Sequence, residues 1–318
     1  MKKKNSTPSL PSLDDFFLSL RTSNFSDETL YNYERDLGTF TNFLATDVKT
    51  DFDSVTKHTM ELYKAYLSSI DRKTAKGNTP TKKLSAGSIN RSLSSLRSYF
   101  KYLVDKDYPI PLPPEAIKLV KMPRKHARVA EFENLVKLVE FPTQFEKNKI
   151  VGLRNRAMLE TLFATGMRIS ELISLNKNQI DKSGRIFIRG KGKKERFVYL
   201  TGRAKDWIIK YIKTRGDDNP ALFVPYRGRN FNTPRARISP NYLQMKIKYY
   251  NEAIGINVPT SAHSLRHGFA TYLAERGANP AAIQILLGHE SLNTTTRYVH
   301  ASDKYAEKTH RKFHPLKK

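Results

Sequence analysis

Apolar residues recur three or four positions apart between positions 10 and 44, which is the spacing of a helix with one buried face. The pattern breaks at Asn24 and resumes after Ser26. A serine followed by the acidic residues Asp27 and Glu28 is a favourable helix start. The pattern therefore predicts two successive amphipathic helices in this stretch.

Two further helices follow from the same spacing. It predicts a short helix over 60–70 and a longer one over 85–104, with Ser85 as the N-cap. Four prolines between 109 and 114 prevent the longer helix from continuing. The segment 71–83 is basic and almost free of apolar residues, so we expect a loop there.

The rest of the chain mixes helices with one predicted hairpin. Apolar residues alternate or run together in 185–189 and 196–200, as in strands, and the glycines and lysines of 190–194 form a turn between them. Helical spacing and helix start and stop signals predict helices at 131–139, 153–163, 169–175, 263–275 and 291–299, from Ser239 onward, and from Asn279 to Gly288.

These patterns predict a mainly α protein with a small β-sheet. We expect an all-helical domain over 1–120, a basic linker over 121–130, and an α+β domain over 131–318. The 318 residues are enough for about two domains of ordinary size.

The charge of the chain narrows the choice of partner. Lysine and arginine number 56 against 30 acidic residues, which gives a net charge of +26. Such an excess favours a polyanion, most often nucleic acid. An acidic membrane surface or a solvated basic face would give the same count, but the basic residues are spread along the whole chain rather than gathered on one amphipathic helix.

Other signals exclude whole classes of site. The chain has no cysteine, which excludes disulfides, thiolate zinc sites and a cysteine nucleophile. No apolar run approaches the roughly 20 residues of a membrane span, and no apolar segment follows the basic first residues as in a signal peptide. We expect a cytoplasmic protein that does not enter a membrane.

Two segments place a cation beside glycine. Arg168 lies in the first turn of a predicted helix, with Glu171 three residues further on the same face. That arrangement suits a phosphate, although an ordinary surface ion pair has the same spacing. Lys191 lies between two glycines at the predicted hairpin tip, where it can reach a phosphate or donate a proton, and many basic turns look alike.

Two segments contain histidine. His263 and Arg266 share a helix face, so a group that moves protons and a cation lie about one turn apart. His267 adds a histidine pair of the kind found in zinc sites, but no third ligand is apparent nearby, and we expect His267 in the core. A helix that ends in a glycine turn at Gly288, followed by a second short helix between His289 and Tyr298, is also typical of a helix-turn-helix.

The order of these segments resembles the tyrosine recombinase (phage integrase) family. ATGMRISEL resembles its first arginine box, GKGKKER its hairpin lysine box, HSLRH its His-x-x-Arg box, and LLGHESLNTTTRYVH its histidine-to-tyrosine box. These boxes span about 130–305, and FSDETLYNYERDLGTFTNFL resembles the family's helical core-binding (SAM-like) domain. The compact length is most similar to the Xer-type and integron-type branch.

The resemblance implies a role for each candidate residue. Tyr298 attacks a DNA phosphate to form a 3′-phosphotyrosyl link, and Arg168 and Arg266 hold the non-bridging oxygens. Lys191 is implied as the general acid, His263 as the proton partner of Tyr298 and His289 as a phosphate donor, and Glu171 steadies the cations. No metal ion, ATP or other cofactor is implied.

The resemblance also implies the partners. They are double-stranded DNA, which the two domains enclose as a C-shaped clamp, and three further protomers in a tetramer on two DNA sites. Ala301 to Phe313 is implied as the segment exchanged between protomers, whereas a frayed basic tail is the ordinary alternative. A requirement for a partner recombinase or activator stays open, as does the choice between chromosome-dimer resolution and mobile-element integration.

Two other classes of protein fit part of this pattern. A type IB topoisomerase shares the chemistry but relaxes DNA instead of exchanging strands. A non-catalytic DNA-binding regulator accounts for the charge and the helix-turn-helix pattern, but not for a tyrosine, two arginines, a lysine and two histidines in this order.

Overall fold

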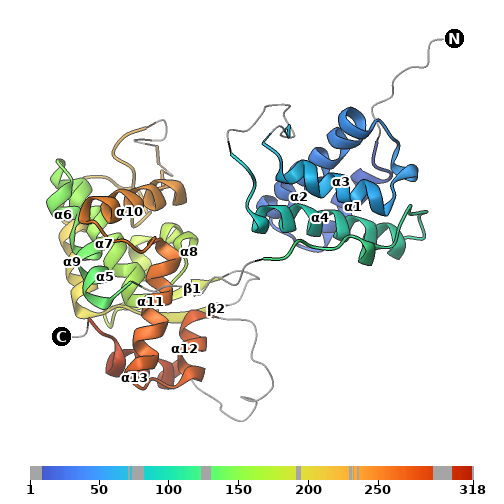
Figure 1. Ribbon diagram of the computed structural model, residues 1–318. Coiled ribbons are helices and arrows are strands. Elements are labelled where there is room, and N and C mark those ends of the chain that lie inside the picture. Colours follow the sequence, from blue (N-terminus) through green and yellow to red (C-terminus); the bar gives the residue numbers. More distant parts are fainter. Residues whose placement is uncertain are drawn as a thin grey trace. The chain divides into compact units, whose positions relative to one another are not determined.

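The computed structural model describes residues 9–70, 72–73, 82–122, 130–190, 195–228, 231, 233–234, 236–288 and 303–316. The chain divides into two compact units, Met1–Lys125 and His126–Lys318 (Figure 1). Most of the predicted loop 71–83 and the predicted helix 291–299 lie outside the described residues. No described helix is long and apolar enough to cross a membrane.

The first unit is helical, as the spacing of apolar residues predicted. Its described α-helices are α1 (Leu13–Thr22), α2 (Asp27–Phe43), α3 (Lys57–Ser68) and α4 (Ala86–Asp105). The hydroxyls of Ser26 and Ser85 accept hydrogen bonds from the backbone N–H groups of Thr29 and Ser88, so both predicted N-caps are confirmed. A short π-helix, Leu44–Val48, extends α2 beyond the predicted end.

Aromatic side chains fill the core of this unit. Phe16 of α1, Phe40 of α2 and Tyr99 of α4 are buried there. A buried carboxylate, Asp36, accepts hydrogen bonds from Arg91, Ser92 and Ser95 and so joins α2 to α4 through polar contacts as well.

The second unit combines helices with one hairpin. Its described α-helices and strands are α5 (Phe132–Glu140), α6 (Pro142–Phe145), α7 (Lys149–Thr165), α8 (Ile169–Ser174), β1 (Arg185–Arg189), β2 (Glu195–Tyr199), α9 (Gly202–Ile212), α10 (Pro240–Ile254), α11 (Ala262–Glu275), α12 (Pro280–Leu287) and α13 (Asp303–Phe313). Helix α9 was not predicted, although Ala204, Ile208 and Tyr211 lie at helical spacing and are buried. Short helix α6 was not predicted either.

Helix α7 is the centre of this unit. It is buried on nearly all sides and packs against α5, α9 and α11 (Figure 1). It ends at Gly166, whose φ of +62° is left-handed. A Cβ atom there would lie 2.5 Å from the ring of Phe269, so only glycine fits. The chain therefore turns sharply into α8, with Arg168 at its N-cap position.

The hairpin directs alternate side chains inward. β1 and β2 are antiparallel, and Ile188 pairs with Arg196. Arg196 and Val198 point toward the core from β2, which contacts α7, α12 and α13. Arg196 is thus an arginine at a buried strand position, which requires partners for its charge.

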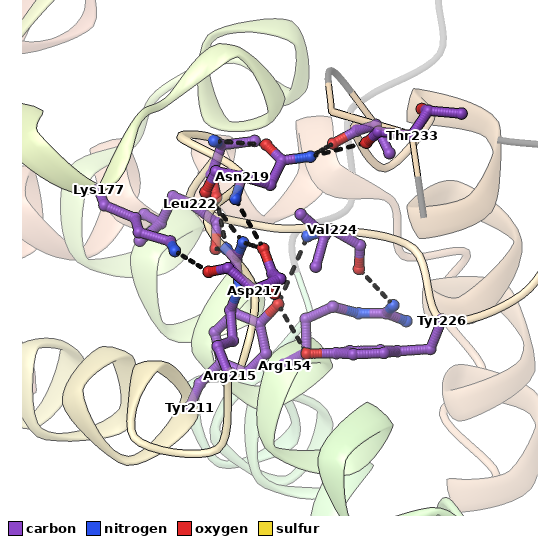
Figure 2. Close-up of polar contacts among 12 residues, drawn as sticks. Arg154, Lys177, Tyr211, Arg215, Asp217, Asn219, Leu222, Val224, Tyr226 and Thr233 are labelled. Atoms are coloured by element: carbon purple, nitrogen blue, oxygen red, sulfur yellow. Dashed lines mark hydrogen bonds and ion pairs between the residues drawn. The ribbon is translucent and has the colours of Figure 1, made fainter. Parts of the chain in front are cut away.

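Side-chain hydrogen bonds to the backbone hold the segment between α9 and α10. Arg215 donates to the carbonyl of Leu222 and pairs with Asp217, while Asn219 donates to the carbonyl of Thr233 (Figure 2). Arg154 of α7 donates to the carbonyl of Val224. These contacts fix the segment to the unit that carries α7, although it has almost no regular secondary structure.

The C-terminal segment packs against its own unit. Thr309, His310, His314 and Leu316 are buried, and His314 Nε2 donates to the carbonyl of Phe163 at 3.1 Å. The alternative of a frayed tail is therefore wrong for the described residues. Phe313 is half-buried, and the histidines make the buried contacts. Exchange with a neighbouring protomer stays a prediction.

Candidate functional site

Arg168 and Glu171 form a closed pair at the start of α8. The Glu171 carboxylate accepts from the Arg168 backbone N–H at 2.7 Å and from Arg168 Nη1 at 3.0 Å. The Arg168 side chain is still 35% exposed, whereas Glu171 is 5% exposed. The predicted pairing of these residues on one face is confirmed, and it leaves one side of the guanidinium open.

Arg196 completes this group and was not predicted. Its Nη1 and Nη2 donate to the two oxygens of Glu171 at 3.0 and 2.8 Å. Sequence reasoning assigned Arg196 only to a strand. Its inward position in the hairpin was the available signal, because a buried arginine needs a carboxylate or carbonyl partner.

Arg266 joins the group from α11. It is 6% exposed, and its Nη1 donates to the carbonyl of Gly166 at 2.8 Å. Its Nη2 donates to the carbonyl of Leu287 at 2.6 Å. The two predicted arginines are therefore brought together by the turn after α7 and by the end of α12.

Three arginines hold three successive carbonyls at the end of α12. Arg196 Nε donates to Leu286 at 2.9 Å, Arg266 to Leu287 at 2.6 Å and Arg168 to Gly288 at 3.4 Å. The last carbonyls of a helix have no partner within the helix and carry its negative partial charge. This helix end therefore holds the three guanidinium groups close to one another.

The described part of this arginine group has a positive excess. Arg168, Arg196 and Arg266 face one carboxylate, Glu171, so three positive charges against one negative charge leave +2. Burial lowers the pKa of Arg266, the charges of Arg168 and Arg196 add to this effect and Glu171 opposes it, and together they bring the pKa to about 10. Such a site is stabilised by an anion.

Glu171 stays ionised in this setting. Burial raises its pKa, but hydrogen bonds from the Arg196 side chain and the Arg168 backbone outweigh that effect and hold the pKa below its usual value. The carboxylate is therefore available as a fixed acceptor that orients the guanidinium groups.

The two histidines of α11 lie on an exposed surface. Their rings are 4.9 Å apart, and both residues are exposed. The expectation that His267 lies in the core is wrong, because the apolar face of α11 is formed by Leu265, Phe269 and Leu273 instead. Partial burial lowers the pKa of His263, and the nearby charges of His267, Arg266 and Arg168 lower it further.

Lys191, His289 and Tyr298 lie outside the described residues. Gly190, which precedes Lys191, and Gly288, which precedes His289, adjoin the arginines. A Cβ atom on Gly190 would lie 3.0 Å from Glu171 Oε1 and 3.6 Å from Arg168 Nη1. On Gly288 it would lie 3.1 Å from Arg196 Nη1. Both segments therefore leave the described structure beside the arginine group.

The arginine group does not line a described cavity. Two cavities, of about 430 and 570 Å³, lie along the segment between α9 and α10, and none of the predicted site residues lines either. Small-molecule sites are usually concave and largely apolar, whereas this group is cationic and its most exposed member is Arg168, at 35%. Among the described residues no group of three or more histidine, aspartate or glutamate residues is arranged to hold a metal ion.

Sequence profiles match both parts of the chain. The profile of the phage integrase family matches residues 128–305. The profile of the phage integrase N-terminal SAM-like domain matches residues 13–107.

Curated relatives match over nearly the whole length. The chain is 34% identical over 304 residues to tyrosine recombinase XerC of Thermodesulfovibrio yellowstonii, covering 92% of each chain. It is 30% identical over 297 residues to tyrosine recombinase XerD of Staphylococcus epidermidis, covering 91% of this chain and 93% of the relative.

A solved structure supports the fold. A lambda integrase tetramer bound to a Holliday junction matches with a TM-score of 0.67 and 17% identity, covering 92% of this chain and 80% of the integrase. At this identity the likeness concerns the fold alone.

Proposed function

The chain belongs to the phage integrase family and is a tyrosine recombinase, an enzyme that recombines DNA by cleaving and rejoining strands, and we propose that its arginine group binds the scissile phosphate. Arg168 and Arg266 would hold the two non-bridging oxygens. The observation that carries this proposal is their convergence on the end of α12 with an excess of positive charge.

The proposed cleavage step exchanges one phosphate ester bond for another. The Tyr298 hydroxyl oxygen bonds to phosphorus, the bond from phosphorus to the 5′-oxygen breaks, and the protein is left on the 3′-phosphate. Lys191 gives a proton to the leaving 5′-oxygen, and His263 takes the proton of Tyr298. His263 suits this role because its lowered pKa leaves it neutral and able to accept a proton.

In this proposal the arginines and His289 stabilise the negative charge that develops on the non-bridging oxygens of the phosphate. Guanidinium groups bind phosphate oxygens with fixed geometry, and cations aimed at the transferring phosphoryl group are a large part of such catalysis. Glu171 has no proton to give at neutral pH, so its role is to orient Arg168. A 5′-hydroxyl from another strand reverses the step, and no external energy source enters.

The proposed substrate is double-stranded DNA, bound by four protomers on two sites. The net charge of +26 supports a long anionic partner, and the matched lambda integrase structure is a tetramer on a Holliday junction. Exchange of the C-terminal segment between protomers belongs to the same proposal. It requires α13 to leave the contacts that it makes with its own unit.

Trapping of a covalent adduct tests the nucleophile. A duplex would be recovered from a random-sequence pool by binding to the wild-type protein and then nicked near the bound centre, so that a cleaved strand end diffuses away. We expect wild-type protein to form a protein–DNA adduct and Tyr298→Phe to form none, at unchanged DNA affinity. An adduct formed by Tyr298→Phe would remove Tyr298 from this role.

The same duplex separates the alternatives. Relaxation of supercoiled DNA without any two-site product would favour a type IB topoisomerase. Specific binding with no adduct from any protein preparation would favour a non-catalytic regulator.

A further inference from the structure

We propose that Arg196 is a positioning residue for strand cleavage, because it fixes Glu171 and the end of α12 so that Arg168 meets the phosphate. This inference rests on the proposed function of the site. Arg196 lies on β2, far in sequence from both α8 and α12, and contacts both.

The first contact saturates the Glu171 carboxylate. Oε1 accepts from Nη1 of Arg168 and from Nη1 of Arg196, both at 3.0 Å. Oε2 accepts from the Arg168 backbone at 2.7 Å and from Arg196 Nη2 at 2.8 Å. With Arg196 in place, the carboxylate is held from two sides, and its orientation dictates where the Arg168 guanidinium lies.

The second contact fixes the end of α12. Arg196 Nε donates to the carbonyl of Leu286 at 2.9 Å, and the guanidinium lies flat against Gly288, where a Cβ atom would be 3.1 to 3.3 Å from Cδ, Nη1 and Cζ. Gly288 has a φ of +63°, so the turn after α12 depends on glycine and on this contact. His289 is the next residue in the chain.

Arg196 acts through these neighbours and not on DNA directly. Its side chain is 7% exposed, and all three of its nitrogens donate to protein oxygens, whereas Arg266 donates to described residues only through Nη1 and Nη2. A phosphate approaching the site would meet Arg168 first, because that side chain is 35% exposed.

Only arginine can make both contacts at once. Its planar fork spans two carboxylate oxygens while Nε reaches a third acceptor, whereas lysine offers one compact charge. Arg196→Lys preserves the charge and most of the volume. The substitution therefore tests the hydrogen-bond geometry of the guanidinium group separately from its charge. Removal of the side chain altogether would leave Glu171 partly unpaired in a buried place and destabilise the unit.

The test compares Arg196→Lys with Arg189→Lys. Arg189 lies on the same hairpin, its side chain is 62% exposed, and its Nε is 3.9 Å from Glu195, so it is a matched control. The measurements are the rate of adduct formation at saturating nicked duplex, the DNA dissociation constant and the urea midpoint. We expect Arg196→Lys to slow adduct formation about 10- to 100-fold, as for an indirect loss of alignment, with little change in affinity, and Arg189→Lys to match wild type.

A double-variant cycle separates positioning from general structural support. If Arg196 acts through Glu171, Arg196→Lys in a Glu171→Gln background slows adduct formation much less than in wild type. Equal slowing in both backgrounds overturns the route through Glu171. Should Arg196→Lys fold poorly, Arg196→Gln, which keeps a hydrogen-bond donor on a smaller, uncharged side chain, supports the same cycle, with rates normalised to the folded fraction.

The outcomes distinguish this inference from the proposed function. If wild type forms adducts and the Arg196 variants form them at the same rate, the positioning role is wrong and the proposed function stands. A loss of DNA affinity with unchanged cleavage would make Arg196 a binding residue, which also overturns the inference. If wild type forms no adduct on the nicked duplex, the proposed function fails, and this inference with it.

Discussion

Two groups of arginine and glutamate side chains lie along α7, and they differ in their balance of charge. The first joins Arg156 and Glu160 of α7 to Glu140 and Arg203, with Glu160 Oε1 accepting from Arg156 at 2.8 Å and from Arg203 at 2.7 Å. Two positive and two negative charges cancel there. The second is the arginine group beyond the C-terminal end of α7, where the described charges sum to +2.

A structural ion cluster and a functional one differ in their balance of charge. Both groups contain buried charged side chains, and either looks like a network that joins helices. Only the second has unbalanced charge, so only the second gains when an anion enters. Burial alone does not identify a site, because structural ion pairs shift pKa values too.

The two carboxylates respond to burial in opposite ways. Burial raises the pKa of Glu160 more than its two arginines lower it, and its Oε2 has no hydrogen-bond partner among the described residues. Hydrogen bonds hold the pKa of Glu171 below its usual value. Glu171, the carboxylate beside the proposed phosphate site, thus has the more complete set of hydrogen bonds, as expected for a group that must stay fixed and ionised.

The largest effect expected from this comparison is on cleavage. Arg266→Ala removes a cation aimed at the phosphate and should slow adduct formation about 10²- to 10³-fold or more, as the loss of a single charge-stabilising donor does. Arg203→Ala removes one cation from the balanced group and should lower stability while leaving adduct formation per folded molecule close to wild type. Adduct rates on nicked duplex, with folded fractions from urea unfolding, measure both.

A comparable loss of cleavage in Arg203→Ala, after correction for folding, would contradict the distinction between the balanced group and the arginine group. It would mean that the balanced group also controls the site, and that charge excess does not mark function in this protein.

A smaller effect is expected on stability, which should depend on pH through the C-terminal segment that packs against the same end of α7. His310 and His314 are hydrogen-bonded to the carbonyls of Ala164 and Phe163, in the last turn of that helix, where carbonyls lack partners in the helix. Burial lowers the pKa of His310 to about 4 and lowers that of His314 well below its usual value. Both histidines are therefore neutral when folded.

Stability should fall with acidification because of these histidines. Between about pH 6.5 and pH 4 the unfolded chain binds a proton at His310 that the folded chain does not, so the free energy of unfolding decreases by about 1.4 kcal/mol per pH unit for that proton. Urea unfolding across this range measures the slope, and His310→Gln should make it shallower. Lys308→Gln, exposed on the same helix, is the control. An unchanged slope in His310→Gln would show that the histidine is accessible to protons in the folded state.

Sequence reasoning predicted the local features of this protein well. Serine caps at Ser26, Ser85 and Ser239 each accept the expected backbone hydrogen bond, because capping depends on residues a few positions apart. The pairing of Arg168 with Glu171 also follows from a spacing of three residues.

It failed where distant segments decide the environment. Arg196 looks like a polar strand residue until β1, α8 and α12 surround it. His310 and His314 look like a polar tail, but unpaired carbonyls at the end of α7 give them a buried place. His267 was expected in the core, yet the buried apolar face of α11 lies two positions away on either side, at Leu265 and Phe269. For Arg196 and the two C-terminal histidines, the partners lie far away in sequence.

The smallest expected effect is on the salt dependence of DNA binding. Each phosphate that a cation neutralises releases counterions, so log K falls with log salt by about 0.9 per contact on duplex DNA. For the whole chain, with its net charge of +26, we expect a steep slope of about −5 or steeper. Arg168→Ala should make the slope shallower by about 0.9, because one phosphate contact is lost. Arg203→Ala should leave the slope unchanged, since Arg203 is committed to Glu140 and Glu160.

Fluorescence anisotropy with the recovered duplex, at four or more salt concentrations, gives each slope. Equal slopes for wild type and Arg168→Ala would mean that Arg168 does not neutralise a phosphate in the bound state, and the charge excess at the end of α12 would then need another explanation.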